Sequence, residues 1–316
     1  MIVFLATKAG LSSFTDLLPN FLRPVRRRIQ ALTYGQLAGL GELPAATYIF
    51  SDFERMNSVQ IELAQQAFEQ IRNHGPELIL LNEPARYKPR FAFMRDLYER
   101  GINPFNVYRV HEIGPHVRYP VFVRLENDHT GPRTDLLTNE SDLRLALLQA
   151  TLGAVPFQDL MVVEFVDTRR PDGYYEVYAA SKFGCDLKPR HKNTHHHWIV
   201  KGPNRGRGDR WDPWQVQEDR DYQTGQVHEG IAEAFELAGI EWGRADYAII
   251  DGKPVIYEIN SNPVTVPQPD KYLLERQDSQ DHMVRITLDA LEQLDSHSPP
   301  HPGIQLEFWL RDRQPA

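Results

Sequence analysis

The stretch VIYEINSNP, residues 255–263, decides how this chain is interpreted. Its apolar, strand-forming run ends in Glu258 and Asn260. Successive side chains of a strand alternate between its two faces, so Glu258 and Asn260 share one face while Tyr257 lies on the other. Two oxygen donors side by side at a strand end need either a local hydrogen-bond partner or a hard cation.

A second apolar run precedes this stretch, and the dipeptide Asp-Gly at 251–252 between the two runs predicts a hairpin. A two-residue loop would place Asp246 opposite Tyr257. A three-residue loop, with the glycine in the left-handed conformation, places Asp246 opposite Glu258. In that register two carboxylates meet beside Asn260, and they would repel each other unless a cation lay between them. Oxygen ligands of this kind suit Mg²⁺. The alternative is that Glu258 pairs with an arginine and the other two side chains stabilise local turns.

The composition of the 316 residues is that of an ordinary globular protein of more than one domain, with 41% hydrophobic and 25% charged residues. A net charge of −8 argues against a dedicated nucleic-acid binder, and no apolar run is long enough for a membrane span. The single cysteine, Cys185, excludes an internal disulfide and favours a reducing cytoplasm. It has no assignable base partner, so we interpret it as structural.

Strand-like and helix-like patterns alternate in the first part of the chain. A helical pattern at 58–75 lies between strand patterns at 46–51 and 77–82. Such alternation predicts a mainly parallel, helix-covered sheet. We therefore expect an α/β first domain over residues 1–112.

The pattern changes to α+β after this domain. A strand with Arg124 on one face, a helical pattern at 140–153 and strand patterns at 159–167 and 173–184 predict a small lid over residues 113–185. The remaining residues, 186–316, contain the hairpin and predict a larger C-terminal lobe.

The ordered series of segments resembles the ATP-grasp superfamily, in the neighbourhood of glutathione synthetase and the peptide–glutamate ligases. LNEPARYKPRFAFMRDLYERGIN at 81–103 resembles the segment that closes the first domain of that family. YPVFVRLEND at 119–128 resembles its phosphate-binding lid strand, and LMVVEFVD at 160–167 its adenine-binding hinge. GRADYAIIDGKPVIYEINSNP at 243–263 is the most specific match and resembles its paired metal-binding strands.

The resemblance implies an ATP-grasp architecture that binds ATP between lid and lobe. It also implies that Asp246, Glu258 and Asn260 hold Mg²⁺, or alternatively Mn²⁺, between the phosphates. The backbone of Phe165 and Val166 would face adenine.

The resemblance assigns the ribose and phosphate contacts too. A carboxylate, Glu164 or Asp167, would reach the ribose. Arg90 and Arg124 stand where the family often has lysine, which is not a neutral exchange because a guanidinium binds phosphate in a wider, bidentate manner. Lys182 is the remaining basic candidate after the hinge.

The segment PRHKNTHHHWIVKG, residues 189–202, has three interpretations. Arg190 could join Arg124 as a catalytic cation that contacts phosphate or substrate, with some of the histidines beside it. His191, His195 and His197 could instead bind zinc, although no cysteine or acidic ligand is near. The histidines could also be incidental on a surface strand. Trp211 and Trp214 fit either a substrate-facing loop or a docked cover.

The activity implied by the resemblance is that of an ADP-forming carboxylate–amine ligase, which makes an amide from small-molecule substrates through an acylphosphate. Neither a nucleic acid nor a membrane is an expected partner, and family members are often dimers or tetramers. Two alternatives stay open: an ATP-grasp kinase that stops at phosphoryl transfer, and a nucleotide-binding regulator without turnover.

Overall fold

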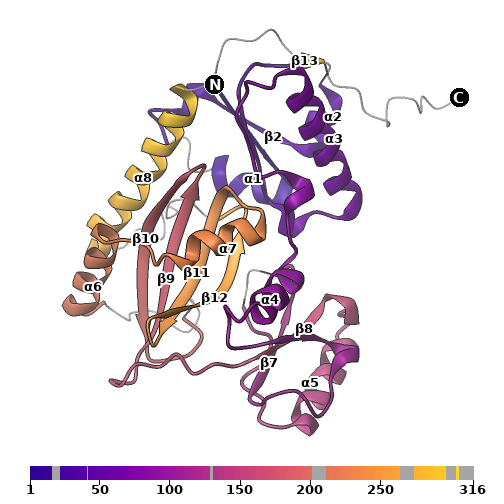
Figure 1. Ribbon diagram of the computed structural model, residues 1–316, viewed down its shortest axis with the longest axis vertical. Coiled ribbons are helices and arrows are strands. Elements are labelled where there is room, and N and C mark those ends of the chain that lie inside the picture. Colours follow the sequence, from indigo (N-terminus) through magenta and orange to yellow (C-terminus); the bar gives the residue numbers. More distant parts are fainter. Residues whose placement is uncertain are drawn as a thin grey trace, which may run out of the picture.

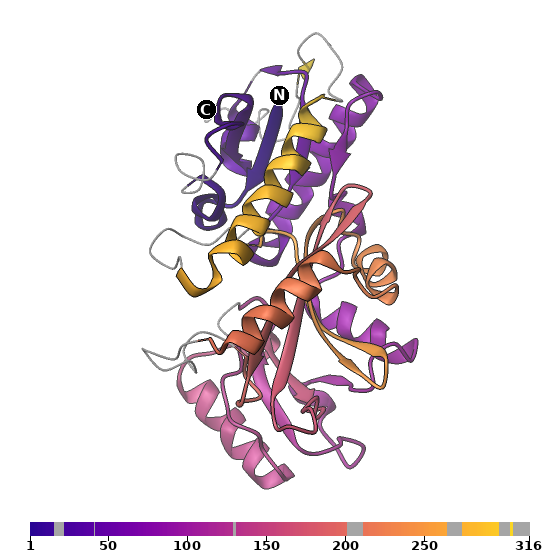
Figure 2. The same ribbon diagram turned by 90° about the vertical axis from the view of Figure 1, so that its left-hand side faces the viewer.

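The computed structural model describes residues 1–15, 22–40, 42–128, 131–200, 211–263, 274–296 and 304–305. The described chain forms a parallel sheet, a three-stranded antiparallel sheet and a four-stranded antiparallel sheet. Figures 1 and 2 show the first domain at one end of the long axis and the lid at the other. The predicted combination of an α/β domain with two α+β parts is confirmed.

The first domain has a parallel sheet in the order β2-β1-β4-β5. β1, one of its two inner strands, is entirely apolar and buried along its whole length. Helix α3 packs an apolar face on this sheet, and α8 returns from the far end of the sequence to contact β1 (Figure 2). The elements are β1 Ile2–Ala6, α1 Lys8–Thr15, β2 Ile29–Thr33, α2 Tyr34–Gly39, β3 Glu42–Leu43, β4 Thr47–Phe50, α3 Ser58–His74, β5 Leu80–Leu81 and α4 Arg90–Glu99.

The lid has three antiparallel strands in the order β6-β8-β7, with α5 packed on one face. The elements are β6 Val107–Arg109, β7 Val121–Leu125, α5 Glu140–Leu152 and β8 Leu160–Glu164. Strand β6 pairs with β8, so the lid sheet takes in residues that precede the expected boundary at 113.

The C-terminal lobe has four antiparallel strands in the order β10-β9-β11-β12. Strand β9 was expected in the lid, but it pairs with β10 on one side and β11 on the other, so the two antiparallel sheets divide between β8 and β9 rather than at residue 185. The elements are β9 Tyr175–Phe183, β10 Asp186–His195, α6 Pro213–Thr224, α7 Gly230–Ala238, β11 Trp242–Ile250, β12 Lys253–Asn260 and α8 Gln277–Ser296. A short strand β13, Ile304–Gln305, pairs with β3.

No helix in these described ranges combines the length and the apolar character needed to cross a membrane.

Candidate functional site

A cavity of about 360 Å³ lies between the lid sheet and the sheet of the C-terminal lobe. This volume is within the usual range for small-molecule sites. Apolar residues form one part of the lining: Met94, Phe105, Phe122, Val163, Phe165, Val166, Val177, Trp198 and Tyr257. Polar residues form another: Arg124, Glu164, Thr168, His191, Asn193, Arg244, Asp246 and Glu258.

The hairpin β11–β12 places Asp246 opposite Glu258 by a different route from the one expected. The turn contains two residues, Asp251 and Gly252, both with positive φ, as in a tight hairpin turn. A β-bulge between Asp246 and the next pair then adds one residue to β12 and restores the Asp246–Glu258 register.

The bulge also corrects the expected side-chain alternation. Tyr257 was predicted on the face away from Glu258, but both residues line the cavity. A bulged strand carries an extra residue, which interrupts the simple alternation of faces at that point. The Tyr257 hydroxyl lies 3.1 Å from the hydroxyl oxygen of Thr168, in the segment that follows the hinge.

Two arginines share the carboxylate of Glu258. Arg90, at the start of α4, and Arg124, on β7, donate to Glu258 Oε2 over 2.9 and 3.2 Å. All three residues are buried. These charge-assisted hydrogen bonds hold the lid strand β7, helix α4 and strand β12 together. The alternative of an arginine partner for Glu258, such as Arg244, is therefore present in another form: Arg90 and Arg124 are the partners, and Arg244 pairs with Asp246.

Asp246 and Asn260 complete the set of expected metal ligands. Arg244 donates to Asp246 over 2.7 Å, and the amide nitrogen of Asn260 donates to Glu258 Oε1 over 3.2 Å. Asn260 Oδ1 is buried and has no hydrogen-bond partner among the described residues. An unpaired buried oxygen is costly, and it suits a cation ligand. Two facing carboxylates and this oxygen are donors of the type that Mg²⁺ prefers, so the residues fit the metal.

Positive charge exceeds negative charge at this point, because four guanidinium groups surround the carboxylates of Asp246 and Glu258, and Asp128 adds one further negative charge near Arg124. Burial and the charge of Arg90 lower the pKa of Arg124 to about 10. Burial and the charge of Arg244 lower the pKa of Arg190 to about 9. Both shifts have the direction expected of buried cations that repel each other, and a bound polyanion would oppose them.

The expected hinge lines the cavity through Glu164, Phe165 and Val166, whereas Asp167 is outside the lining and pairs with Arg169. The carboxylate of Glu164 is buried and accepts hydrogen bonds from Arg118 and Tyr108 and from backbone N–H groups. It therefore ties the lid strands together from the wall of the cavity.

Lys182 is not brought to the cavity. It lies on the opposite face of β9, with its Nζ 5.7 Å from the centroid of the Phe235 ring on α7. Arg190 lies at the bulge of β10, between Pro189 and His191, and is buried.

The histidines form local turns. His195 Nδ1 accepts from the backbone of His197 over 2.9 Å, and His197 Nδ1 accepts from that of Ile199 over 3.1 Å. Within the described ranges no group of three or more His, Cys, Asp or Glu side chains is placed to hold a metal ion. His191 alone of the three lines the cavity.

Trp211 and Trp214, which were expected in either a substrate-facing loop or a docked cover, lie outside the cavity lining. The guanidinium carbon of Arg276 lies 3.9 Å from the ring centroid of Trp211, and Trp214 packs edge-on against Tyr174. These contacts favour the docked cover over the substrate-facing loop.

Sequence reasoning missed Trp198, which lines the cavity and lies 5.1 Å from Phe122 and 5.6 Å from Phe165 between ring centroids. The aromatic residue after a histidine run was the only available signal, and a single tryptophan does not identify a binding slot.

Comparisons with known proteins returned no matching family model and no matching curated protein. Among solved structures, a D-alanine–D-alanine ligase from Bacillus anthracis is similar with a TM-score of 0.46 and 10% identity, covering 93% of this chain and 99% of that one. The same enzyme complexed with ATP is similar with a TM-score of 0.49 and 11% identity, covering 93% and 98%.

A RimK domain ATP-grasp protein from Sphaerobacter thermophilus DSM 20745 is also similar, with a TM-score of 0.46 and 14% identity over 94% of this chain and 99% of that one. This third structure is described as that of an ATP-grasp protein. At these identities the likeness concerns the arrangement of the chain alone.

Proposed function

We propose that the protein is an ATP-dependent carboxylate–amine ligase that releases ADP and phosphate. The observation that supports this best is the excess of guanidinium groups, three of them buried, over the carboxylates beside an apolar cavity. This combination suits a ligand with a flat apolar part and several negative charges. Mg·ATP is such a ligand.

In this proposal the base of ATP occupies the apolar slot between Val163, Phe165 and Trp198. Asp246, Glu258 and Asn260 would hold Mg²⁺, which when bound supplies positive charge to the phosphates. Arg124 and Arg190 neutralise the charge that develops on the transferred group.

The reaction has two steps. An oxygen of the substrate carboxylate forms a bond to the γ-phosphorus as the bond to the β-phosphate oxygen breaks, and ADP leaves. The nitrogen of an amine then attacks the acyl carbon, the carbon–oxygen bond to phosphate breaks, and the amine loses its proton. The cavity between the two sheets limits the access of water to the acylphosphate.

The test is to incubate the protein with Mg·ATP, a panel of carboxylates and hydroxylamine, and to measure ADP and hydroxamate together. A ligase forms both in equal amounts with the correct carboxylate, because hydroxylamine traps an acylphosphate. Glu258→Gln serves as the control for contaminating activity and should form neither.

The two alternatives give different results. A kinase forms ADP and a stable phosphorylated product without hydroxamate. A regulator binds Mg·ATP but forms no ADP across the panel. Either result would replace the proposed ligase activity.

A further inference from the structure

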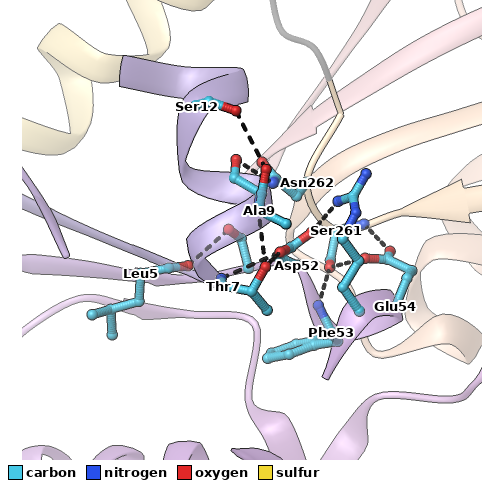
Figure 3. A network of polar contacts seen from close by, with 12 residues as sticks. Leu5, Thr7, Ala9, Ser12, Asp52, Phe53, Glu54, Ser261 and Asn262 are labelled. Atoms are coloured by element: carbon cyan, nitrogen blue, oxygen red, sulfur yellow. Dashed lines mark hydrogen bonds and ion pairs between the residues drawn. The ribbon is translucent and has the colours of Figure 1, made fainter. Parts of the chain in front are cut away.

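A network of buried polar contacts joins the first domain to the end of β12 (Figure 3). We call it the interdomain network and define it by Thr7, Asp52, Glu54, Ser261 and Asn262. Ser261 follows Asn260 directly, so contacts made by Ser261 act on the backbone at the expected metal ligand.

Ser261 is held by three hydrogen bonds from one short segment. Its backbone N–H donates to Glu54 Oε1, its hydroxyl donates to Glu54 Oε2 over 2.8 Å, and its oxygen accepts from the N–H of Phe53 over 3.0 Å. Ser261 is completely buried and Glu54 is 4% exposed. The bidentate contact fixes both the backbone and the side chain of the residue after Asn260.

The position of Glu54 is determined by the residues before it. Asp52 has a φ of 68°, in the left-handed region, and starts the short 3-10 turn Phe53–Arg55 that carries Glu54. The backbone N–H of Thr7 donates to Asp52 Oδ2 over 3.2 Å, and the Thr7 hydroxyl donates to the same oxygen. A Cβ on Gly10 would lie 2.1 Å from Asp52 Oδ2, so only glycine leaves room for this arrangement.

Packing of the first domain against the C-terminal lobe does not by itself require a carboxylate at Glu54. Burial raises the pKa of Glu54, which is the mark of a group held where its charge is unfavourable. Apolar side chains would join the domains at lower cost. What the carboxyl group adds is two acceptors at fixed positions, both used on the residue that follows Asn260.

We propose that Glu54 is a positioning residue: by holding Ser261 it orients Asn260 for the metal, and the buried Oδ1 of Asn260 has no hydrogen-bond partner among the described residues. This proposal rests on the proposed binding of Mg·ATP. Groups that orient metal ligands typically contribute 10–100-fold to metal affinity.

The experiment measures thermal stability at a fixed, saturating ATP concentration while Mg²⁺ is varied, for the wild type and three variants. Glu54→Ala removes both acceptors and should raise the Mg²⁺ concentration at half-maximal stabilisation by about tenfold or more. Glu54→Gln keeps one carbonyl acceptor and should recover most of this loss. Thr47→Val is the matched control. It removes a buried hydrogen bond outside the interdomain network, from the Thr47 hydroxyl to the Leu294 carbonyl on α8, and should leave the Mg²⁺ concentration at half-maximal stabilisation unchanged.

Equal Mg²⁺ requirements in Glu54→Ala and the wild type, or equal increases in Glu54→Ala and Thr47→Val, would overturn the positioning role. A wild type without any magnesium-dependent stabilisation would instead overturn the proposed function itself. If Glu54→Ala does not fold, Ser261→Ala takes its place, since it removes the hydroxyl contact and keeps the backbone one, and an unchanged Mg²⁺ requirement there would overturn the role equally.

Discussion

At the scale of single residues, the site differs from its expected form in the basic groups. Arg90 and Arg124 occupy the two positions where the resemblance leads one to expect lysine, and both already contact Glu258. A guanidinium can hold the carboxylate with one nitrogen and a phosphate with another, which a lysine ammonium does less readily. The arginines therefore fit a site that is preorganised before its ligand arrives.

The exchange of Arg124 for methionine tests this view. Arg124 is buried beside the like charge of Arg90, and Glu258 keeps Arg90 when Arg124 is removed. We expect the free energy of unfolding without ligand to change by less than about 1 kcal/mol, and ATP affinity to fall about tenfold. Calorimetric titration and chemical denaturation measure the two quantities.

Lys182→Met is the matched control, because it removes a cation from the face of the lobe sheet that packs on α7, away from the cavity. It should leave ATP affinity unchanged. If Lys182→Met weakened ATP as much as Arg124→Met does, the phosphate site would have to be placed elsewhere.

At the scale of elements, the sequence predicted four segments that contribute residues to the cavity lining, because each has a strong local pattern. They are residues 81–103, 119–128, 160–167 and 243–263. The Asp246–Glu258 register was also predicted, but through a three-residue loop instead of a bulge. A bulge depends on packing against neighbouring strands and leaves no local signal. The sheet to which β9 belongs depends on long-range pairing for the same reason, and local periodicity could not assign it.

Glu164 gives a prediction for the lid strands. Burial acts to raise its pKa, but hydrogen bonds from Arg118 and from backbone N–H groups outweigh burial and lower the pKa below its usual value. A lowered folded-state pKa stabilises the protein fully above the unfolded-state pKa of about 4.3, and this stabilisation is lost as the pH falls through the folded-state value.

We expect Glu164→Gln to lower the free energy of unfolding at pH 7 by about 1–3 kcal/mol, because buried donors lose their acceptor. The difference from the wild type should shrink as the pH is lowered below about 4. Denaturation curves across this pH range measure it, and a constant difference at all pH values would show that the carboxylate charge does not matter.

At the scale of the whole molecule, three parts meet at one strand end. The lid supplies Arg124, the segment that closes the first domain supplies Arg90, and the first domain holds Ser261 through Glu54. β12 of the C-terminal lobe contributes Glu258 and Asn260 to this point. A ligand that binds there should stabilise the whole chain rather than one part of it.

The most direct measurement is the thermal unfolding midpoint with and without Mg²⁺ and ATP, for the wild type and Glu258→Gln. At a ligand concentration of about a hundred times Kd the expected gain is about 2.7 kcal/mol, which corresponds to a rise of several degrees. The wild type should show this rise only when both Mg²⁺ and ATP are present, and Glu258→Gln should lose most of it. No rise in a folded wild type at millimolar Mg·ATP, or an equal rise in Glu258→Gln, would contradict the assignment of a magnesium-nucleotide site to this strand end.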